Sequence, residues 1–234
     1  SREIDRLEDA VEAFLLGAPR LTVSAACLGV AGPVIDGRCV ATNLPWEVHE
    51  RRLSAAVHAP AKLVNDLEAA ARGVLSLPAE GFLTLQEGNP KPGANMALIA
   101  AGTGLGQALL VADGQEIRVV PSEGGHADFA PRDEIQMDLL RFLRPEFGHV
   151  SWERVLSGPG LHSVYRFLQT RSGHAAPEWL HDRLQREDPG RVVGEVGLAG
   201  SDPVCAEALD LFVAIYGAQA GNLALEVLAL GGVI

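Results

Sequence analysis

Apolar positions in the first part of the chain follow two spacings, one typical of helices and one typical of strands. Leu7, Val11 and Phe14 recur three or four residues apart, which predicts an amphipathic helix. Strands and helices alternate up to about residue 75, as in an α/β domain with a parallel or mixed sheet. The expected elements are a helix at 3–16, strands at 21–30 and 61–66, a hairpin at 34–42 that turns at Asp36-Gly37, and helices at 47–57 and 67–75.

A loop-like stretch divides the pattern. Residues 86–95, QEGNPKPGAN, contain two prolines and two glycines, which predict a domain boundary nearby. We therefore expect a smaller α/β domain at 1–80 and a larger one at 81–234. The later expected elements are helices at 132–143 and 151–156, helices near His162 and Trp179, and a long helix that begins at Ser201-Asp202-Pro203 and ends near Leu225.

Composition narrows the class of protein. Of the 234 residues 47% are hydrophobic, enough for a packed core, and the formal net charge of −11 disfavours a nucleic-acid surface. No uninterrupted apolar run approaches the roughly 20 residues that span a bilayer. Cys27, Cys39 and Cys205 match no zinc spacing. We therefore expect a cytoplasmic protein that binds neither nucleic acid nor membrane.

The stretch 97–111, ALIAAGTGLGQALLV, places three glycines between two apolar runs. A P-loop would need Lys-Ser/Thr after the last glycine, and a dinucleotide fingerprint would need a different glycine spacing and a following helix. The apolar run QALLV instead predicts a second strand, so the glycines join two antiparallel strands. Such a hairpin can bind phosphate through backbone N–H groups, with Thr103 as a further donor, or it can be a structural turn whose glycines supply positive φ.

Four polar motifs are candidate site residues, and each has a structural alternative. Asn65-Asp66 ends a strand, where a carboxylate can take a proton from a hydroxyl, but Asp66 could equally cap the next helix. Glu123 and His126 flank two glycines and could bind vicinal hydroxyls, or they could belong to an ordinary polar turn.

The other two motifs are weaker when each is taken alone. Glu153 could accept a hydroxyl proton, or it could favour the dipole of a helix in whose first turn it lies. Thr42-Asn43 could donate and accept hydrogen bonds, or it could cap the next element.

The motifs in chain order carry more information than any one of them. EGGHADFAP at 123–131 and GHVSWERVLSGPGL at 148–161 are the most specific, and VND, AGTGLG and GNLAL…GGV accompany them. Together they strongly resemble the bacterial ATP-dependent glucokinase family, in the hexokinase branch of the actin-like ATPase superfamily, from about residue 21 to residue 234. The resemblance implies a two-domain actin-like (ribonuclease H-like) fold and the phosphorylation of D-glucose by ATP with Mg²⁺, with a homodimer common in the family.

The resemblance also implies a role for each candidate residue. Asp66 resembles the catalytic base that takes the proton from the sugar 6-hydroxyl. The implied sugar ligands are Asn65, Asp66, Glu123, His126 and Glu153, with Thr42 and Asn43 lining the sugar cleft. Gly102, Thr103 and Gly104 resemble the second phosphate loop, and no protein residue is implied as a metal ligand.

Two parts of the family pattern are not found. Members begin with a strand and an Asp-x-Gly-Gly-Thr turn, the first phosphate loop, and continue beyond GGVI with an adenosine-contacting segment. We therefore expect a fragment, truncated at both ends, that is inactive by itself while its full-length parent is an enzyme.

Two other functions are compatible with parts of the pattern. One is a kinase or sugar-responsive regulator of the repressor/open-reading-frame/kinase family, which ranks second because no cysteine-rich zinc motif follows His126. The other is a non-catalytic sugar-binding protein, which would tend to lose Asp66.

Overall fold

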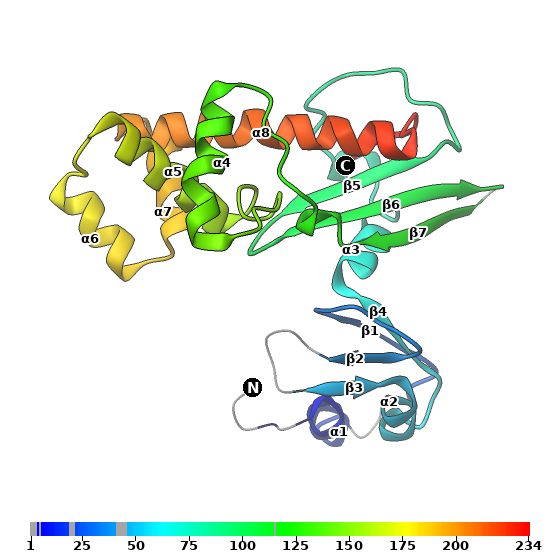
Figure 1. Cartoon of the computed structure of the whole chain (residues 1–234). Helices are drawn as coiled ribbons and strands as arrows, with labels where there is room; N and C mark the ends of the chain where they lie inside the picture. Colours follow the sequence, from blue (N-terminus) through cyan, green and yellow to red (C-terminus); the bar gives the residue numbers. More distant parts are fainter. Residues whose placement is uncertain (1–3, 5, 19–21, 41–45, 115) are drawn as a thin grey trace. The chain divides into compact units, whose positions relative to one another are not determined.

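The computed structural model divides the chain into two compact units, Ser1–Gln86 and Glu87–Ile234, here called the N-terminal and C-terminal units. It describes residues 4, 6–18, 22–40, 46–114 and 116–234 (Figure 1). The division falls at the start of the proline- and glycine-rich stretch, later than the boundary after residue 80 that the sequence suggested.

The N-terminal unit is built on two small pairs of strands. β1 pairs with β4 in parallel, and β2 pairs with β3 in the antiparallel sense. Helix α1 packs on α2, and the core consists of Val30, Cys39, Val48, Leu53 and Leu63. The elements of this unit are α1 (Leu7–Leu16), β1 (Ala26–Val30), β2 (Arg38–Val40), β3 (Glu47–His49), α2 (Glu50–Val57), β4 (Ala61–Asn65), α3 (Asp66–Val74) and a 3₁₀ turn, η1 (Ala79–Gly81).

The predicted tight turn at Asp36-Gly37 is confirmed. Ile35 and Arg38 exchange two backbone hydrogen bonds of 2.9 and 3.0 Å, and both central residues have positive φ, 51° for Asp36 and 70° for Gly37. Positive φ at both positions defines a type I′ turn, which favours Asp-Gly.

Two expected boundaries in this unit are wrong. Residues 47–49 form strand β3, and the helix begins only at Glu50, because Val48 is buried opposite Cys39 in the β2–β3 pair. The strand expected from residue 21 begins at Ala26, where its pairing with β4 starts.

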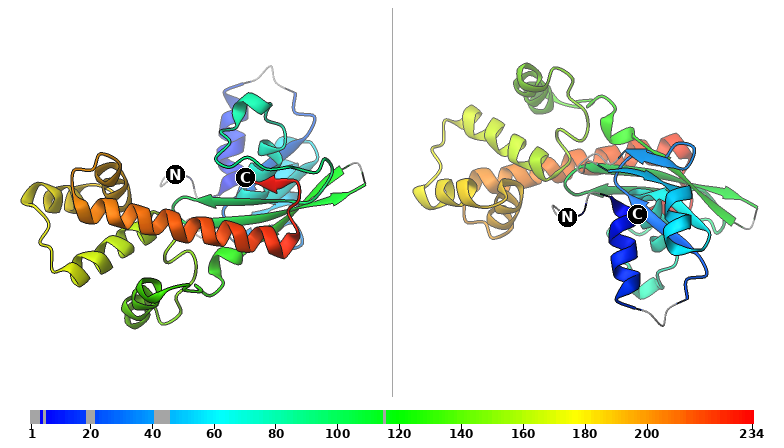
Figure 2. Two further views of the ribbon diagram at one scale, coloured as in Figure 1. Left: turned by 90° about the horizontal axis from the view of Figure 1, so that it is seen from above. Right: turned by 90° about the horizontal axis from the view of Figure 1, so that it is seen from below.

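The C-terminal unit is a four-stranded sheet with helices. The strand order is β7-β6-β5-β8, with β8 parallel to β5 and the other neighbours antiparallel. The C-terminal part of the long helix α8 lies beside the sheet. Helices α5 and α7 pack on the N-terminal part of α8 (Figures 1 and 2). The elements are β5 (Met96–Ala101), β6 (Leu105–Asp113), β7 (Glu116–Ser122), a 3₁₀ turn, η2 (Gly124–His126), α4 (Glu134–Phe147), α5 (Gly158–Ser172), α6 (Glu178–Arg186), α7 (Pro189–Leu198), α8 (Pro203–Val227) and β8 (Gly232–Val233).

Helix caps place several of these elements. The start of α8 is capped by Asp202, whose carboxylate accepts a 2.9 Å hydrogen bond from the Cys205 backbone N–H. Helix α7 was not expected from the sequence, because β-branched valines and glycines have low helix propensity. It forms because Asp188 caps it and because Val192, Val193 and Val196 are buried in the core.

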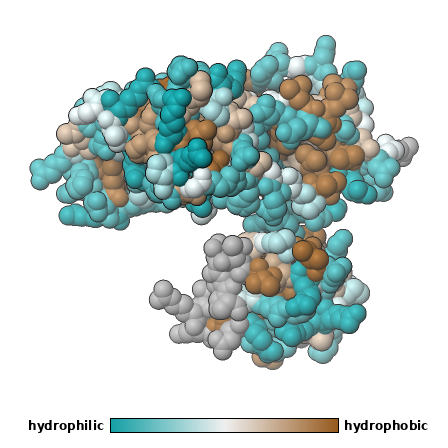
Figure 3. Space-filling model, viewed as in Figure 1, coloured by the Kyte–Doolittle hydropathy of each residue, from teal (hydrophilic) through white to brown (hydrophobic). Residues whose placement is uncertain are grey.

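Helix α8 also bears on the membrane question. Among the described residues it is the one helix whose length and composition would suffice to cross a membrane, with a mean hydropathy of 1.3 over its most apolar window. It packs against α5, α7 and β5, and it carries the buried polar side chain of Gln219. Leu225 near the end of α8 and its C-cap residue Leu228 are exposed. Apolar residues also gather on the right-hand part of the C-terminal unit in the space-filling view (Figure 3).

Candidate functional site

The glycine-rich stretch is a hairpin between two antiparallel strands, as the sequence predicted. Ala101 at the end of β5 pairs with Leu105 at the start of β6, so Gly102, Thr103 and Gly104 form the loop. The Gly102 N–H donates a 2.8 Å hydrogen bond to the Gly104 carbonyl. None of these three residues has a positive φ, so a turn whose glycines serve only to supply positive φ is the wrong explanation.

The two glycines differ in their surroundings. A Cβ atom added at Gly104 would lie 2.5 Å from Oε2 of Glu153, whereas one added at Gly102 would meet no atom within 4 Å. Gly104 is therefore required for the close approach of the Glu153 carboxylate. Gly102 leaves one side of the hairpin open, where a ligand could reach the backbone.

Two distant loops are joined by backbone hydrogen bonds. Phe129 N–H donates to Val150 O at 3.0 Å, Trp152 N–H to Ala127 O at 3.0 Å, and Glu153 N–H to Gly125 O at 2.9 Å. The helix expected at 151–156 is therefore absent: these residues form turns, since the loop at 125–129 engages their backbone. The assignment of Glu153 to the first turn of a helix is likewise wrong.

This junction brings Glu123, His126 and Glu153 into a row. Nε2 of His126 lies 3.8 Å from Oε2 of Glu123, and Nδ1 lies 3.8 Å from Oε1 of Glu153. The side chains of His126 and Glu123 are 62% and 66% exposed, whereas that of Glu153 is 27% exposed. Two carboxylates on either side of an imidazole offer acceptors and a donor to a ligand that carries several hydroxyl groups.

The Glu153 carboxylate also contacts the glycine hairpin. Its Oε2 accepts a 3.0 Å hydrogen bond from the backbone N–H of Leu105, the residue that follows the loop. One side chain therefore links the row of polar groups to the hairpin.

Asn65 and Asp66 lie at the start of α3 in the N-terminal unit. Oδ1 of Asn65 accepts hydrogen bonds from the backbone N–H groups of Leu67, at 2.9 Å, and Glu68, at 3.4 Å. Its Nδ2 donates to Gly32 O at 3.2 Å. Asn65, and not Asp66, is therefore the N-cap of the helix.

Asp66 is the first residue of α3 and is exposed. Its Oδ1 accepts a 2.8 Å hydrogen bond from the Leu67 N–H. It also affects a neighbour: burial raises the pKa of the Cys39 thiol, and the Asp66 carboxylate raises it further. The side chain is thus held at the end of a strand and remains accessible.

The site residues belong to different parts of the chain. The structure brings Glu123, His126, Glu153 and the hairpin 102–104 together within the C-terminal unit, while Asn65 and Asp66 belong to the N-terminal unit. Thr42 and Asn43 lie outside the described residues. In the described part of the chain, no group of three or more His, Cys, Asp or Glu side chains is placed to hold a metal ion.

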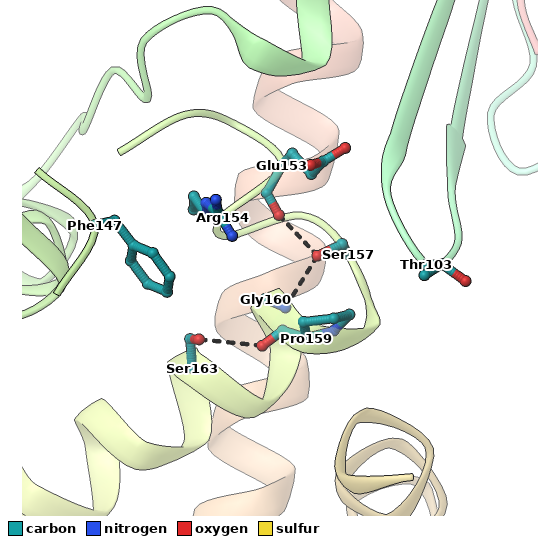
Figure 4. Close-up of a pocket in the computed structure, with 8 residues that line it drawn as sticks. All are labelled: Thr103, Phe147, Glu153, Arg154, Ser157, Pro159, Gly160 and Ser163. Carbon is teal, nitrogen blue, oxygen red and sulfur yellow. Dashed lines mark hydrogen bonds between the residues drawn. The ribbon is translucent and has the colours of Figure 1, made fainter. Parts of the chain in front are cut away.

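A shallow pocket of about 60 Å³ adjoins Glu153, and Thr103 and Ser157 are among its lining residues (Figure 4). Sequence reasoning did not identify Ser157, which is only 3% exposed. Its position directly before Gly-Pro-Gly was the available signal, because serine before a proline-containing first turn is a common N-cap.

Comparisons with known proteins agree on one family. A sequence model of the family described as Glucokinase matches residues 1–234. The chain is 42% identical to a glucokinase of Nostoc sp. over 221 residues, which cover 88% of this chain and 65% of that protein. It is 38% identical to a glucokinase of Nostoc punctiforme over 99% of this chain and 72% of the relative. The chain thus spans about two thirds of its relatives' length.

Solved structures agree on the fold. A glucokinase from an Antarctic psychrotroph has a TM-score of 0.80 and 31% identity, covering 99% of this chain and 69% of the other. A ROK family glucokinase from Streptomyces griseus, crystallised with glucose and AMPPNP, has a TM-score of 0.60 at 21% identity, covering 96% and 70%, which shows the fold alone. The expected actin-like ATPase fold class is confirmed.

Proposed function

The chain belongs to the glucokinase family, and from this premise we propose that it carries the sugar-binding residues and one phosphate loop of an ATP:D-glucose 6-phosphotransferase. The activity is proposed for a protein of its relatives' full length that contains this chain. The 234 residues match only 65% of the Nostoc sp. relative, and the part of the chain that the structure describes offers the hairpin 102–104 for phosphate. We therefore propose that the 234 residues by themselves do not phosphorylate glucose at an appreciable rate.

The row Glu123–His126–Glu153 is the observation that carries the proposal. Glucose is uncharged and presents several hydroxyl groups, so a protein recognises it by paired acceptors and donors. A hydroxyl left unmatched in a buried site costs about 1–3 kcal/mol, which is enough to discriminate between epimers. In this proposal Asn65 adds the second N–H of its Nδ2 amide as a donor, since one already binds Gly32.

Asp66 is proposed as the general base. An exposed carboxylate at the end of a parallel strand can accept the proton of the sugar 6-hydroxyl as that oxygen attacks the γ-phosphorus. The hydrogen bond from the Leu67 N–H holds one oxygen. This hydrogen bond orients the carboxylate toward an incoming hydroxyl, and a general base needs such positioning.

The hairpin 102–104 is proposed to bind ATP phosphate. Its open side at Gly102 allows close approach to the backbone, and Thr103 adds a hydroxyl donor. Mg²⁺ would neutralise charge on the phosphates in such a reaction. The described residues contain no cluster suited to hold it, so we assign Mg²⁺ no protein ligand and derive no step through it.

Isothermal titration of the chain with D-glucose, with D-galactose as the epimer control, tests the proposal. We expect saturable binding of glucose that is at least about 10-fold tighter than binding of galactose, the discrimination that one mismatched hydroxyl provides. Equal affinity for both sugars, or no binding, would contradict it. A full-length protein that contains this chain should form glucose 6-phosphate in a coupled assay with ATP. A sugar-responsive binding protein would bind glucose without turnover.

A further inference from the structure

Ser157 makes two hydrogen bonds from one buried hydroxyl group. Its Oγ donates to the backbone carbonyl of Glu153 at 2.7 Å and accepts from the backbone N–H of Gly160 at 3.0 Å (Figure 4). The first bond fixes the backbone of a residue in the row of polar groups. The second caps α5 at its first turn.

The next residue ties the same helix start to the glycine hairpin. The Gly158 N–H donates a 2.8 Å hydrogen bond to the carbonyl of Gly102. The beginning of α5 is thus bonded on one side to Glu153 and on the other to the hairpin. The Glu153 carboxylate is itself bonded to the hairpin, because it accepts a hydrogen bond from the Leu105 N–H.

The hydrogen bond from Ser157 matters for Glu153 because Glu153 belongs to no helix or strand. It lies in a stretch of turns, and its own N–H is bonded to Gly125 in the opposite loop. The peptide group between Glu153 and Arg154 is held on its N–H side by a 3.1 Å hydrogen bond to the Ser151 carbonyl and on its carbonyl side by Ser157. Loss of the bond from Ser157 would leave only the first of these two bonds and would loosen the distances from the carboxylate to His126 and Leu105.

We propose that Ser157 is a positioning residue that holds the Glu153 carboxylate between the sugar-binding row and the phosphate hairpin. The proposal rests on the proposed function of that site. The side chain of Ser157 is 3% exposed, and its hydroxyl group already donates to the Glu153 carbonyl and accepts from the Gly160 N–H, so we expect it to act through Glu153. Its hydroxyl therefore sets sugar affinity and the geometry of the hairpin at once.

Two substitutions and one matched control separate this role from general stability. Ser157→Ala removes both hydrogen bonds. Ser157→Gly also removes the hydroxyl, but glycine is nearly as good an N-cap, so this variant preserves the helix and the fold. Ser163→Ala is the control, because Ser163 is similarly buried in α5 and its Oγ donates to the Pro159 carbonyl, away from Glu153.

The first readout needs no ligand. Hydrogen exchange of the Leu105 amide reports whether the Glu153 carboxylate is in place. In both Ser157 variants we expect the Leu105 amide to exchange roughly 10-fold faster, because about one hydrogen bond is lost. In Ser163→Ala we expect the native exchange rate. Native protection of Leu105 in Ser157→Gly would overturn the proposal, whether or not the chain binds sugar.

The second readout is glucose affinity by calorimetry. The Kd for glucose should rise roughly 10-fold in Ser157→Gly and stay unchanged in Ser163→Ala. If the native chain bound no glucose while Leu105 still responded to Ser157→Gly, the proposed function would fail and the positioning role would stand. An unchanged Kd in a variant whose Leu105 amide is exposed would refute the link to sugar binding.

Discussion

The backbone N–H of Leu105 donates a 3.0 Å hydrogen bond to the carboxylate of Glu153, 48 residues further along the chain. This bond joins the start of β6 to the turn that follows β7 and α4. The bond connects the glycine hairpin to the row Glu123–His126–Glu153, so a change in one is expected to disturb the other. Several consequences can be measured.

Gly104→Ala is expected to disturb sugar binding as well as nucleotide binding. The new Cβ would lie 2.5 Å from Oε2 of Glu153, so the carboxylate must move and lose its bond to Leu105. We expect glucose affinity to fall roughly 10-fold, the cost of about one charged hydrogen bond. Calorimetry with glucose measures this.

Gly102→Ala is the matched control for Gly104→Ala. No atom lies within 4 Å of a Cβ at this position, and its φ is not positive. Glucose affinity and thermal stability should stay near native, while a methyl group on the open side of the hairpin weakens binding of an ATP analogue. A nucleotide affinity unchanged in Gly102→Ala would argue against phosphate binding at this hairpin.

His126→Ala should weaken glucose binding without unfolding the protein, since His126 lies between two carboxylates and is largely exposed. The expected loss is about 10-fold in Kd, the value of one hydrogen bond to a sugar hydroxyl. Asp128→Asn is the control. Asp128 is in the same loop but pairs with His149 at 2.7 Å, so its removal should leave the Kd unchanged. Similar effects of both variants would indicate a loop with a structural role only.

Asp66→Asn is expected to lower kcat by roughly 10²–10⁴-fold, the range for loss of a positioned base. Glucose affinity should change little, because asparagine keeps the shape and one hydrogen-bonding oxygen. The assay requires a full-length protein that contains this chain. Glu68→Gln serves as control, since Glu68 lies in the same helix and pairs with Arg72. Near-native kcat in Asp66→Asn would remove Asp66 from the mechanism.

His162 should make the protein less stable at acidic pH. Burial lowers the pKa of this imidazole in the folded state, with a further contribution from Arg166. The unfolded chain therefore binds the proton first as the pH falls through about 6.5, and stability decreases from there down to the folded-state pKa. Above that window His162 is neutral in both states and has no effect of this kind.

The measurement is the urea midpoint as a function of pH, between about pH 5 and 8. His162→Gln should flatten the acid side of the profile. His181→Gln is the control, because His181 is exposed. A profile with the same slope after His162→Gln would assign the acid sensitivity to other groups.

The sequence by itself determined the features that depend on neighbouring residues. Apolar spacing predicted most helices, Asp36-Gly37 predicted a type I′-compatible turn, and the glycine-rich stretch predicted a hairpin of two strands. These features are local, because propensity, turn chemistry and short-range hydrogen bonds act over a few residues. The quoted motifs likewise identified the family, since they are short and specific.

Only the tertiary structure decided which of those local options prevailed. Residues 151–156 carry a helix-like pattern, yet the backbone N–H groups of Trp152 and Glu153 bond to the carbonyls of Ala127 and Gly125 in another loop. Asn65 and Asp66 are both good caps, and the bond from Asn65 to Gly32 helps orient Asn65 as the one that caps α3. Position 104 is a glycine because a Cβ atom there would lie 2.5 Å from the Glu153 carboxylate, which belongs to a distant part of the chain. Its backbone φ is not positive and does not call for glycine. Such choices depend on contacts between distant segments, which spacing along the chain does not encode.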